Sequence, residues 1–591
     1  MSEEQPCTPP LWEVDRPAGG NIAQRPDRRR FLGQASAAAT IAAGALAGPS
    51  IAFAQSSGSP GPGHVSPPAG VSDGRVMQSF ANRVLAATRE ATIPVPPHTT
   101  NGDETRYHDK SGSYSKGLLQ DGPGRVNLPA YQSLKTALAT GRPSDFERII
   151  IGGTRTQNGP QGALAYGLEG TDAVQFGNAP SPANQESLVV VPPPPAVASP
   201  AYGTELVEMY WGSLLRDVAF TDYPSNPIAN LAAQELSGMP SYAGPRDSHG
   251  QVTPALLFRG GFPGETIGPY ISQLFITPTS LGAQEMGMQM TTYLPNLDYM
   301  TDLTTWQQVQ NGIDTGLRNQ VDSQPRYLCN GRCLSAYTHV DVLYQAYFTA
   351  LLVLGTIAAP LNPGNPYVHS RTQNGFSTFG GPDFAASLGE IAARALDVVW
   401  WHKWVVHLRH RPESGGGIVH LMLTGQGNTI DAHVNSNVLN SQAVQQSFSR
   451  YGSYLLSQAF PEGSPTHPAY PTGHGTVAGA CITMLKFFFD NNFVIPNPLV
   501  PTSDGLSLVP YTGGDAGQIT VGGELNKLAH NVSFAHGIHA GIHWRSDTDS
   551  SIVLGEALAI SILQDRARTY NEKFTVHFTK LDGTTATISN Q

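Results

Sequence analysis

The chain has 591 residues, of which 40% are hydrophobic and 14% are charged, and its formal net charge at pH 7 is −10. This negative charge argues against a general nucleic-acid-binding protein, which needs a basic face. The length allows several ordinary domains or one large domain with insertions, and the 63 glycines and 47 prolines indicate many loops.

The N-terminus has the pattern of an export signal. Arginines at 28–30 precede an Ala-rich run that carries no Lys, Arg, Asp or Glu as far as Ser72, and the small-x-small triplet at 52–54 is typical of a cleavage site. This order of features indicates a bacterial twin-arginine signal rather than a membrane span or an ordinary Ala-rich helix. We therefore expect residues 1–54 to be removed and the protein to be periplasmic or secreted.

Composition divides the rest of the chain into three parts. Residues 55–75 are rich in Gly, Pro and Ser and predict a flexible linker. Residues 76–200 mix short helical patterns with Gly-rich loops, end in the proline-rich stretch VVVPPPPAVASP, and are expected to pack on the core. Residues 201–591 are predicted to form a helical catalytic domain.

Helical periodicity dominates after residue 200 and predicts a mainly α protein without internal repeats. The predicted helices cover 205–220, 339–359, 383–411, 475–491 and 550–570. The third is expected to end at Pro412. The second is too short and too polar at its start to span a bilayer, and we interpret it as a buried core helix. Convincing strand alternation occurs near the C-terminus, in KFTVHFTKLDGTTATIS.

The cysteines suggest one local pair and one core thiol. Cys7 leaves with the signal, and Cys481 lies in an apolar helical pattern typical of a core residue. Cys329 and Cys333 enclose the short sequence CNGRC, which an exported protein could oxidise to a disulfide. A metal pair is the alternative, although the chain has no second cysteine pair to complete it.

A first group of chemical side chains lies in KWVVHLRHRPE. On one continuous helix, Lys403, His407 and Arg411 would share a stripe at i, i+4 and i+8. A Lys and an Arg that face the same way can hold a multiply charged oxyanion. The alternative is a solvated basic helix end, but the tryptophans at 400, 401 and 404 favour a packed segment.

A second group lies in PTGHGT, at a turn that leads into an apolar helix. The Thr472 hydroxyl and the Gly473 N–H can bind an anion at a helix N-terminus. His474 can act as an acid or base near neutral pH, and His467 is expected to line the same cavity. The alternative is an ordinary N-cap with a glycine turn.

The third group is a run of histidines. His536, His539 and His543 are spaced i, i+3 and i+7 and would share one helical face, and Asp547 could orient an imidazole from behind. A zinc site is one alternative, although the chain has no HExxH and no Cys or Glu ligand is obviously placed. A set of buried structural histidines is the other.

Together, the three groups occur in the order of a known family. Lys-x7-Arg-Pro, then Pro-Thr-Gly-His, then His-x3-Asp resembles the vanadium-dependent haloperoxidases and the related acid phosphatases. The bromoperoxidases of red algae and their bacterial relatives are the more similar subgroup. That similarity extends to LLFRGGFPGETIGPYISQ, YMTDL, HVDVLYQAYFTALL, PEGSPTHPAY and GELNKLAHNV.

The resemblance implies a helical-bundle fold of the haloperoxidase/acid phosphatase superfamily, a vanadate cofactor and a homo-oligomer. It implies that hydrogen peroxide oxidises bromide and iodide to hypohalous acid, which halogenates an organic acceptor. The alternatives are an acid phosphatase, with His543 as nucleophile and His474 as general acid, and an oxyanion- or metal-binding relative with weakened turnover.

The resemblance also implies a role for each site residue. His543 would be the axial vanadium ligand, and the vanadate oxygens would be contacted by Lys403, Arg411, Thr472 and Gly473. Lys403 would also polarise the peroxide, His474 would be the acid/base, and His467 would lie near the halide. Trp400, three residues before Lys403, resembles the chloroperoxidase branch instead.

One departure stands out. The family has a second arginine six residues before the axial histidine, where this chain has Gly537, and the surrounding segment is one residue longer. His536 or His539 could replace that arginine, or Arg545 could fold back towards the site.

Overall fold

A computed structural model describes residues 97–160 and 191–591 and the single residues Gly74, Met77 and Ala81. The described residues belong to one compact unit, Gly74–Gln591. The predicted export signal lies outside the described residues, as does the predicted linker apart from Gly74. The structure therefore does not test the export signal, the linker or the domain boundary at residue 200, and all three stay predictions.

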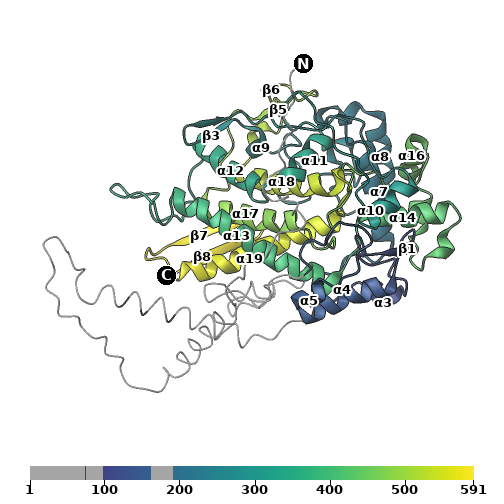
Figure 1. Ribbon diagram of the computed structural model, residues 1–591. Coiled ribbons are helices and arrows are strands. Elements are labelled where there is room, and N and C mark those ends of the chain that lie inside the picture. Colours follow the sequence, from purple (N-terminus) through teal and green to yellow (C-terminus); the bar gives the residue numbers. More distant parts are fainter. Residues whose placement is uncertain (1–73, 75–76, 78–80, 82–96, 161–190) are drawn as a thin grey trace, which may run out of the picture. The chain divides into compact units, whose positions relative to one another are not determined.

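Four long helices form the centre of the molecule (Figure 1). They are α13 (Gly381–Trp401), α17 (Gly473–Phe488), α18 (Val521–Phe534) and α19 (Arg545–Ala567). α17 is apolar around nearly its whole circumference and almost entirely buried, as a helix enclosed by others must be. Gly479 and Gly555 let α17 and α19 approach closely, since a Cβ on either glycine would collide with the backbone of the other helix.

Shorter helices surround this centre. On the C-terminal side of residue 190 they are α7 (Pro200–Leu214), α8 (Pro227–Ser237), α9 (Gln273–Ile276), α10 (Leu303–Gln310), α11 (Gly331–Val340), α12 (Gln345–Thr356), α14 (Pro412–Leu423), α15 (Ser436–Leu439) and α16 (Gln442–Tyr451). On its N-terminal side they are α3 (Asp103–Arg106), α4 (Leu128–Thr140) and α5 (Pro143–Phe146). No helix of the described residues is long and apolar enough to cross a membrane.

Strands are few and short among the described residues, so the fold is mainly α as expected. They pair as four antiparallel two-stranded units, β1 (Gln120–Gly122) with β2 (Arg125–Val126), β3 (Thr279–Leu281) with β4 (Gln284–Met286), β5 (Leu499–Pro501) with β6 (Leu508–Pro510), and β7 (Thr575–Thr579) with β8 (Thr585–Ser589). β7 and β8 lie in the C-terminal stretch where the alternation of apolar and polar residues predicted strands.

Two of the predicted helices are interrupted. α13 ends at Trp401, where a π-helical turn, η3 (His402–His407), begins, and Leu408 then adopts a left-handed backbone with φ of 44°. Pro412 therefore does not end the predicted helix; it opens α14, where its fixed φ and missing N–H suit the first turn. The predicted helix at 339–359 is likewise broken, because α11 ends at Val340 and α12 starts at Gln345.

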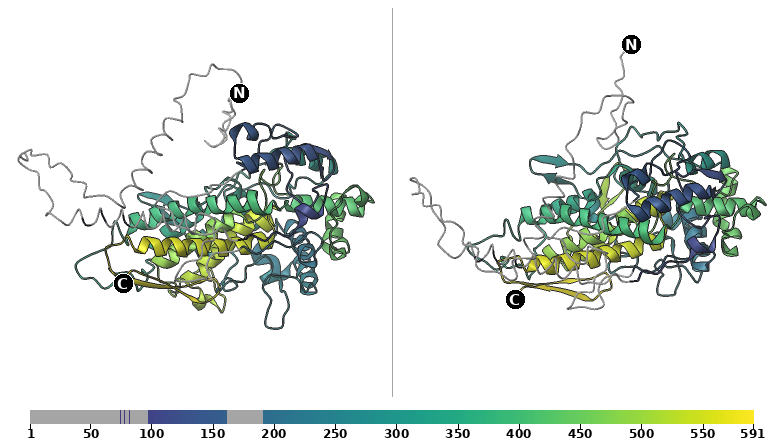
Figure 2. Two further views of the ribbon diagram at one scale, coloured as in Figure 1. Left: turned by 90° about the horizontal axis from the view of Figure 1, so that it is seen from below. Right: turned by 60° about the horizontal axis from the view of Figure 1, so that its bottom comes forward.

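The N-terminal residues lie against this interrupted region. Tyr114 donates its backbone N–H to the carbonyl of Leu408 at 2.8 Å and packs edge-on against Trp404. The Lys116 ammonium is 2.6 Å from Glu413 Oε1, at the start of α14. Figure 2 shows this part of the chain, in purple and blue, along one flank of the long helices. Residues 97–160 thus cover the segment that carries the first group of chemical side chains.

His530, on α18, is held between two carboxylates. Its Nδ1 contacts Glu265 and its Nε2 is 2.9 Å from Asp549 Oδ1. Although burial opposes the charged form, these carboxylates raise the pKa of His530 to about 9. Its charge therefore stabilises the fold fully below its unfolded pKa of about 6.5, and this stabilisation is lost as the pH rises through 9.

We expect His530→Ala to lower the free energy of unfolding by about 3–5 kcal/mol at pH 6, because Glu265 would be left as an unpaired buried carboxylate. The wild-type advantage over the variant should shrink between pH 7 and pH 10. Denaturant unfolding followed by circular dichroism measures both effects. His577→Ala, on the exposed face of β7, is the matched control and should cost less than about 0.5 kcal/mol. Equal losses in the two variants would contradict the assignment.

Candidate active site

Lys403 and Arg411 meet at one centre although they do not share a helix. The π turn places Lys403 so that its ammonium donates to the carbonyls of Pro468 and Ala469, at 2.7 and 2.9 Å. Arg411 follows the left-handed turn and caps α14. The predicted helical stripe is therefore wrong, since the chain leaves the α-helix between these residues. His407, its third member, packs against His402 and Tyr470 instead.

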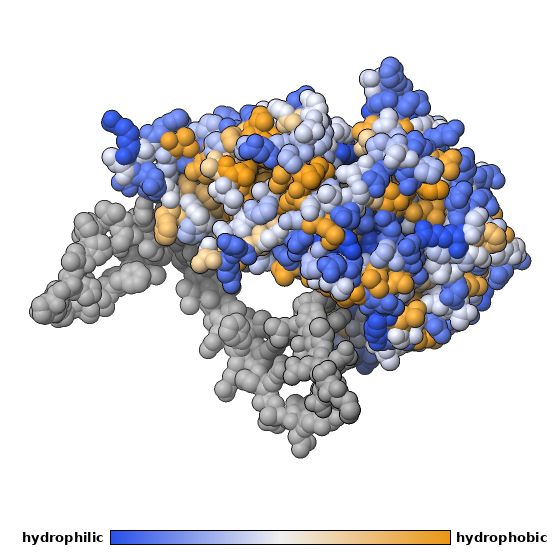
Figure 3. Space-filling view, turned by 90° about the horizontal axis from the view of Figure 1, so that it is seen from above, coloured by the Kyte–Doolittle hydropathy of each residue, from blue (hydrophilic) through white to orange (hydrophobic). Residues whose placement is uncertain are grey.

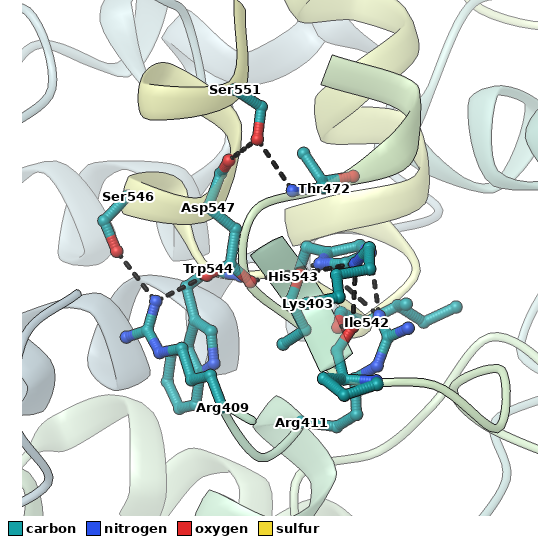
Figure 4. Close-up of polar contacts among 12 residues, drawn as sticks. Lys403, Arg409, Arg411, Thr472, Ile542, His543, Trp544, Ser546, Asp547 and Ser551 are labelled. Atoms are coloured by element: carbon teal, nitrogen blue, oxygen red, sulfur yellow. Dashed lines mark hydrogen bonds and ion pairs between the residues drawn. The ribbon is translucent and has the colours of Figure 1, made fainter. Parts of the chain in front are cut away.

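Arg411 is the hub of the cluster (Figure 4). Its Nη1 lies 2.7 Å from His543 Nε2, and its Nη2 lies 3.0 Å from His467 Nδ1. Burial lowers the pKa of Arg411 to about 10, and burial also lowers the pKa of Lys403 well below its usual value. In the described part of the chain, neither cation forms an ion pair with a carboxylate; their hydrogen bonds go to carbonyls and imidazoles.

Asp547 holds the ring of His543 in one orientation. The ring Nδ1 lies 3.1 Å from Asp547 Oδ2, and Arg409 binds the other oxygen of this carboxylate at 2.5 Å. Burial, with the nearby charges of Arg411 and Lys403, lowers the pKa of His543 well below its usual value. A neutral ring that donates from Nδ1 to Asp547 leaves a lone pair on Nε2, which is the form of histidine that binds metals.

The start of α17 supplies the second group. Thr472 precedes the helix, and its backbone N–H donates to Ser551 Oγ at 2.7 Å. Its hydroxyl is buried and has no hydrogen-bond partner among the described residues. Gly473 is the first helical residue, so its N–H is one of those that the helix itself leaves unpaired. His474 Nε2 lies 3.1 Å from Asp341 Oδ1, in the loop after α11.

The third group does not form one face. A second π turn, η6 (Ala535–His539), precedes His543 and holds two of the three candidate replacements for the arginine, His536 and His539. The ring of His536 stacks on His474 with centroids 4.3 Å apart and is 5.7 Å from the ring of His543. Its buried Nδ1 has no hydrogen-bond partner among the described residues, and burial and His474 lower the pKa of His536.

The other two candidates are engaged elsewhere. His539 Nε2 lies 2.9 Å from the hydroxyl of Tyr270, and its ring packs against Phe220 and Phe258. Arg545 does not fold back, because its guanidinium is paired with Glu208. Among the described residues, no three His, Cys, Asp or Glu side chains are grouped as they would be in a zinc site.

His467 and Trp400 form one side of the centre. Their rings pack with centroids 4.5 Å apart, and the Trp400 indole donates to the carbonyl of Gly159 at 2.6 Å. His467 also offers its backbone carbonyl to Arg411 Nε at 2.9 Å. The structure therefore brings His467 and Trp400 to the same cluster as Lys403, Arg411, Thr472, Gly473, His474, His536, His543 and Asp547.

Two polar residues beside the site were missed by the sequence analysis. Arg409 fixes Asp547, and its only signal was its place two residues before Arg411 in the same motif. Asp341 holds His474, and it lies in the stretch HVDVLYQAYFTALL that resembles the family. In both cases the partner lies more than 130 residues away in the chain.

These residues fit an oxyanion such as vanadate. Two buried cations lack a carboxylate, one buried hydroxyl lacks a partner, and a neutral imidazole presents a lone pair beside them. A buried charge without a countercharge and a buried hydroxyl without a partner are both costly, and a tetrahedral anion bound at this point would supply the countercharge and the partner. His543 Nε2 is the nitrogen that would hold the metal of such an anion.

Comparisons with known proteins agree with this chemistry. A family model described as "VCPO second helical-bundle domain" matches residues 386–572. A vanadium-dependent bromoperoxidase of Ascophyllum nodosum is 33% identical, over 86% of this chain and 91% of the relative. One of Corallina officinalis is 30% identical, over 87% of this chain and 98% of the relative.

A solved structure shares the fold. It is the homohexameric second vanadate-dependent bromoperoxidase of Ascophyllum nodosum, which superposes with a TM-score of 0.80 at 28% identity and covers 87% of this chain and 90% of its own. Shared fold, matched length and sequence identity therefore agree, and the chain belongs to the vanadium-dependent bromoperoxidase family.

Proposed function

We propose that the chain binds vanadate and oxidises bromide and iodide with hydrogen peroxide, releasing hypohalous acid that halogenates organic acceptors. The observation that carries the proposal is the pair of buried cations, Lys403 and Arg411, beside the lone pair of His543 Nε2. The names of the relatives, all vanadium-dependent bromoperoxidases, support the cofactor and the halide.

When bound, vanadate would supply a Lewis acid that activates hydrogen peroxide. His543 Nε2 would hold the metal, while Lys403 and Arg411 balance the charge of the oxygens. The Thr472 hydroxyl and the Gly473 N–H would donate hydrogen bonds to them. Asp341 holds His474 Nε2, which leaves Nδ1 of that ring to exchange protons with the reactants. His467 and Trp400 would form the wall on the halide side.

We also propose that the protein is a homo-oligomer. The homohexamer of Ascophyllum nodosum supports this. Figure 3 shows apolar patches among hydrophilic ones on the upper face, and the described residues include large exposed apolar side chains such as Val321, Val340 and Phe376. Export by the twin-arginine route is a further proposal, supported by the order of arginines, apolar run and cleavage triplet at 28–54.

The activity is tested by bromination of monochlorodimedone with hydrogen peroxide, with and without orthovanadate. Bromination that depends on vanadate is the expected result. Hydrolysis of p-nitrophenyl phosphate without bromination would instead identify the phosphatase. Vanadate binding without either reaction would identify a binding protein.

We expect His543→Ala to abolish vanadate binding, because no other described residue presents an imidazole lone pair between Arg411 and Asp547. Isothermal titration with orthovanadate measures the Kd directly, without turnover. His433→Ala, an exposed histidine outside the cluster, should keep the wild-type affinity. An unchanged Kd in His543→Ala would remove this residue from the role of ligand.

Alanine variants of the two histidines of η6, His536 and His539, can be compared to find which one takes the place of the missing arginine. Since His536 lies in the cluster and His539 does not, we expect His536→Ala to weaken vanadate binding about ten- to a hundredfold. This corresponds to the loss of one charge-assisted contact, roughly 1.5–3 kcal/mol. His539→Ala should keep the wild-type Kd in the same titration. The reverse order of the two variants would show that His539 takes the arginine's place.

For halide preference, we expect faster turnover with bromide and iodide than with chloride. His467 resembles the bromoperoxidase pattern, whereas Trp400 resembles the chloroperoxidase branch, so the measurement decides between them. Steady-state rates with each halide at one pH provide the test. Equal rates with chloride and bromide would refute the preference.

A further inference from the structure

Two cysteines lie side by side at the N-terminus of α11. The Sγ atoms of Cys329 and Cys333 are 3.9 Å apart, and both thiols are free. Asn330, between them, caps the helix by accepting the N–H of Cys333 at 2.9 Å. The cap fixes the first turn so that the two side chains lie on the same side of it. No other described residue separates the sulfurs, since they are in mutual contact.

A cavity reaches Cys329, and the Cys333 sulfur lies 3.9 Å from the Cys329 sulfur. It has a volume of about 340 Å³ and is partly open to solvent, and Cys329 forms part of its wall. The wall also includes the aromatic residues Phe220, Tyr223 and Tyr270. A small uncharged molecule such as hydrogen peroxide can enter a space of this size. The sulfur of Cys481, by contrast, lies in the core away from this cavity.

The two thiols are not equivalent. Cys333 lies within the first helical turn, where the N–H groups and the helix dipole favour a thiolate. A hydrogen bond from Cys329 lowers the pKa of Cys333 to about 7 although burial opposes the charge. The same hydrogen bond and burial raise the pKa of Cys329. One sulfur is therefore suited to attack an oxidant, while its neighbour keeps its proton.

We propose that Cys329 and Cys333 are a peroxide-sensitive pair that closes to a disulfide. The Cys333 thiolate attacks one oxygen of hydrogen peroxide, so that an S–O bond forms, the O–O bond breaks and hydroxide leaves and takes up a proton to become water. The sulfur of Cys329 then attacks the sulfenic acid; the S–S bond forms, the S–O bond breaks and the departing hydroxide takes the Cys329 proton as a second water. Peroxide is reduced and the two thiols are oxidised.

The position of the pair connects it to the candidate active site. α11 runs from these cysteines to Asp341, which caps its other end and holds His474. Gly331, in the first turn, packs directly against the ring of His539 in η6. A disulfide at the start of α11 would therefore tie down the helix that positions the partner of His474. The oxidation itself needs neither vanadate nor halide.

The test exposes the full-length protein, free of vanadate and halide, to hydrogen peroxide and then blocks remaining thiols with N-ethylmaleimide. Peptide mass spectrometry should show that Cys329 and Cys333 have lost two hydrogen atoms and become linked, with recovery of both thiols after dithiothreitol. Cys481 is the internal control and should be blocked as a thiol after unfolding. Equal oxidation of Cys329, Cys333 and Cys481, or oxidation of neither member of the pair, would overturn the proposal.

Single variants separate the two roles. Cys329→Ser should stop at a sulfenic acid on Cys333 that dimedone traps, whereas Cys333→Ser should leave Cys329 unoxidised over the same time. Oxidation of Cys329 at the wild-type rate in Cys333→Ser would overturn the assignment. In the wild type, the disulfide should slow amide hydrogen exchange across 331–341 relative to the reduced protein. Unchanged exchange there would refute the effect on α11.

Discussion

The structure depends on two buried cations that have no carboxylate of their own. Lys403 and Arg411 are removed from water, and the groups that face them are carbonyls and imidazoles. A carboxylate in this position would neutralise them and leave nothing for a ligand, whereas full burial without an anion is costly. The carboxylate of Asp547 stays behind His543 because Arg409 neutralises it there. The positive charge is thus kept for an external anion.

This constraint explains why so many distant elements converge. The carbonyls of 467–469 bind Lys403 and Arg411 from the loop before α17, and the carbonyl of Ile542 binds Arg411 from the turn before α19. The same loop then leads into the N-terminus of α17, where backbone N–H groups remain unpaired. The long central helices hold these ends together, so the packing that stabilises the bundle also sets the geometry of the site.

The sequence predicted what is local and missed what is not. The helices at 475–491 and 550–570 and the C-terminal strands were found because their periodicity is uninterrupted. The segment 383–411 also has continuous apolar periodicity, yet the chain leaves the α-helix at His402. The motif at 471–474 could be interpreted directly, because its residues are adjacent. Asp341 could not be assigned, because its role depends on a fold that brings His474 to it.

Both interruptions next to the site are π-helical turns, at His402–His407 and Ala535–His539. Such a turn holds one residue more than an α-helical turn, so it is in effect a single-residue insertion in a helix. Removing one residue from such a turn would take away the extra residue while the chain beyond it keeps its direction, so the residues inside the turn are the ones whose facing would change. Insertions and deletions of one codon, rather than substitutions, are therefore the changes that would decide which side chain of the 535–539 segment faces the cofactor.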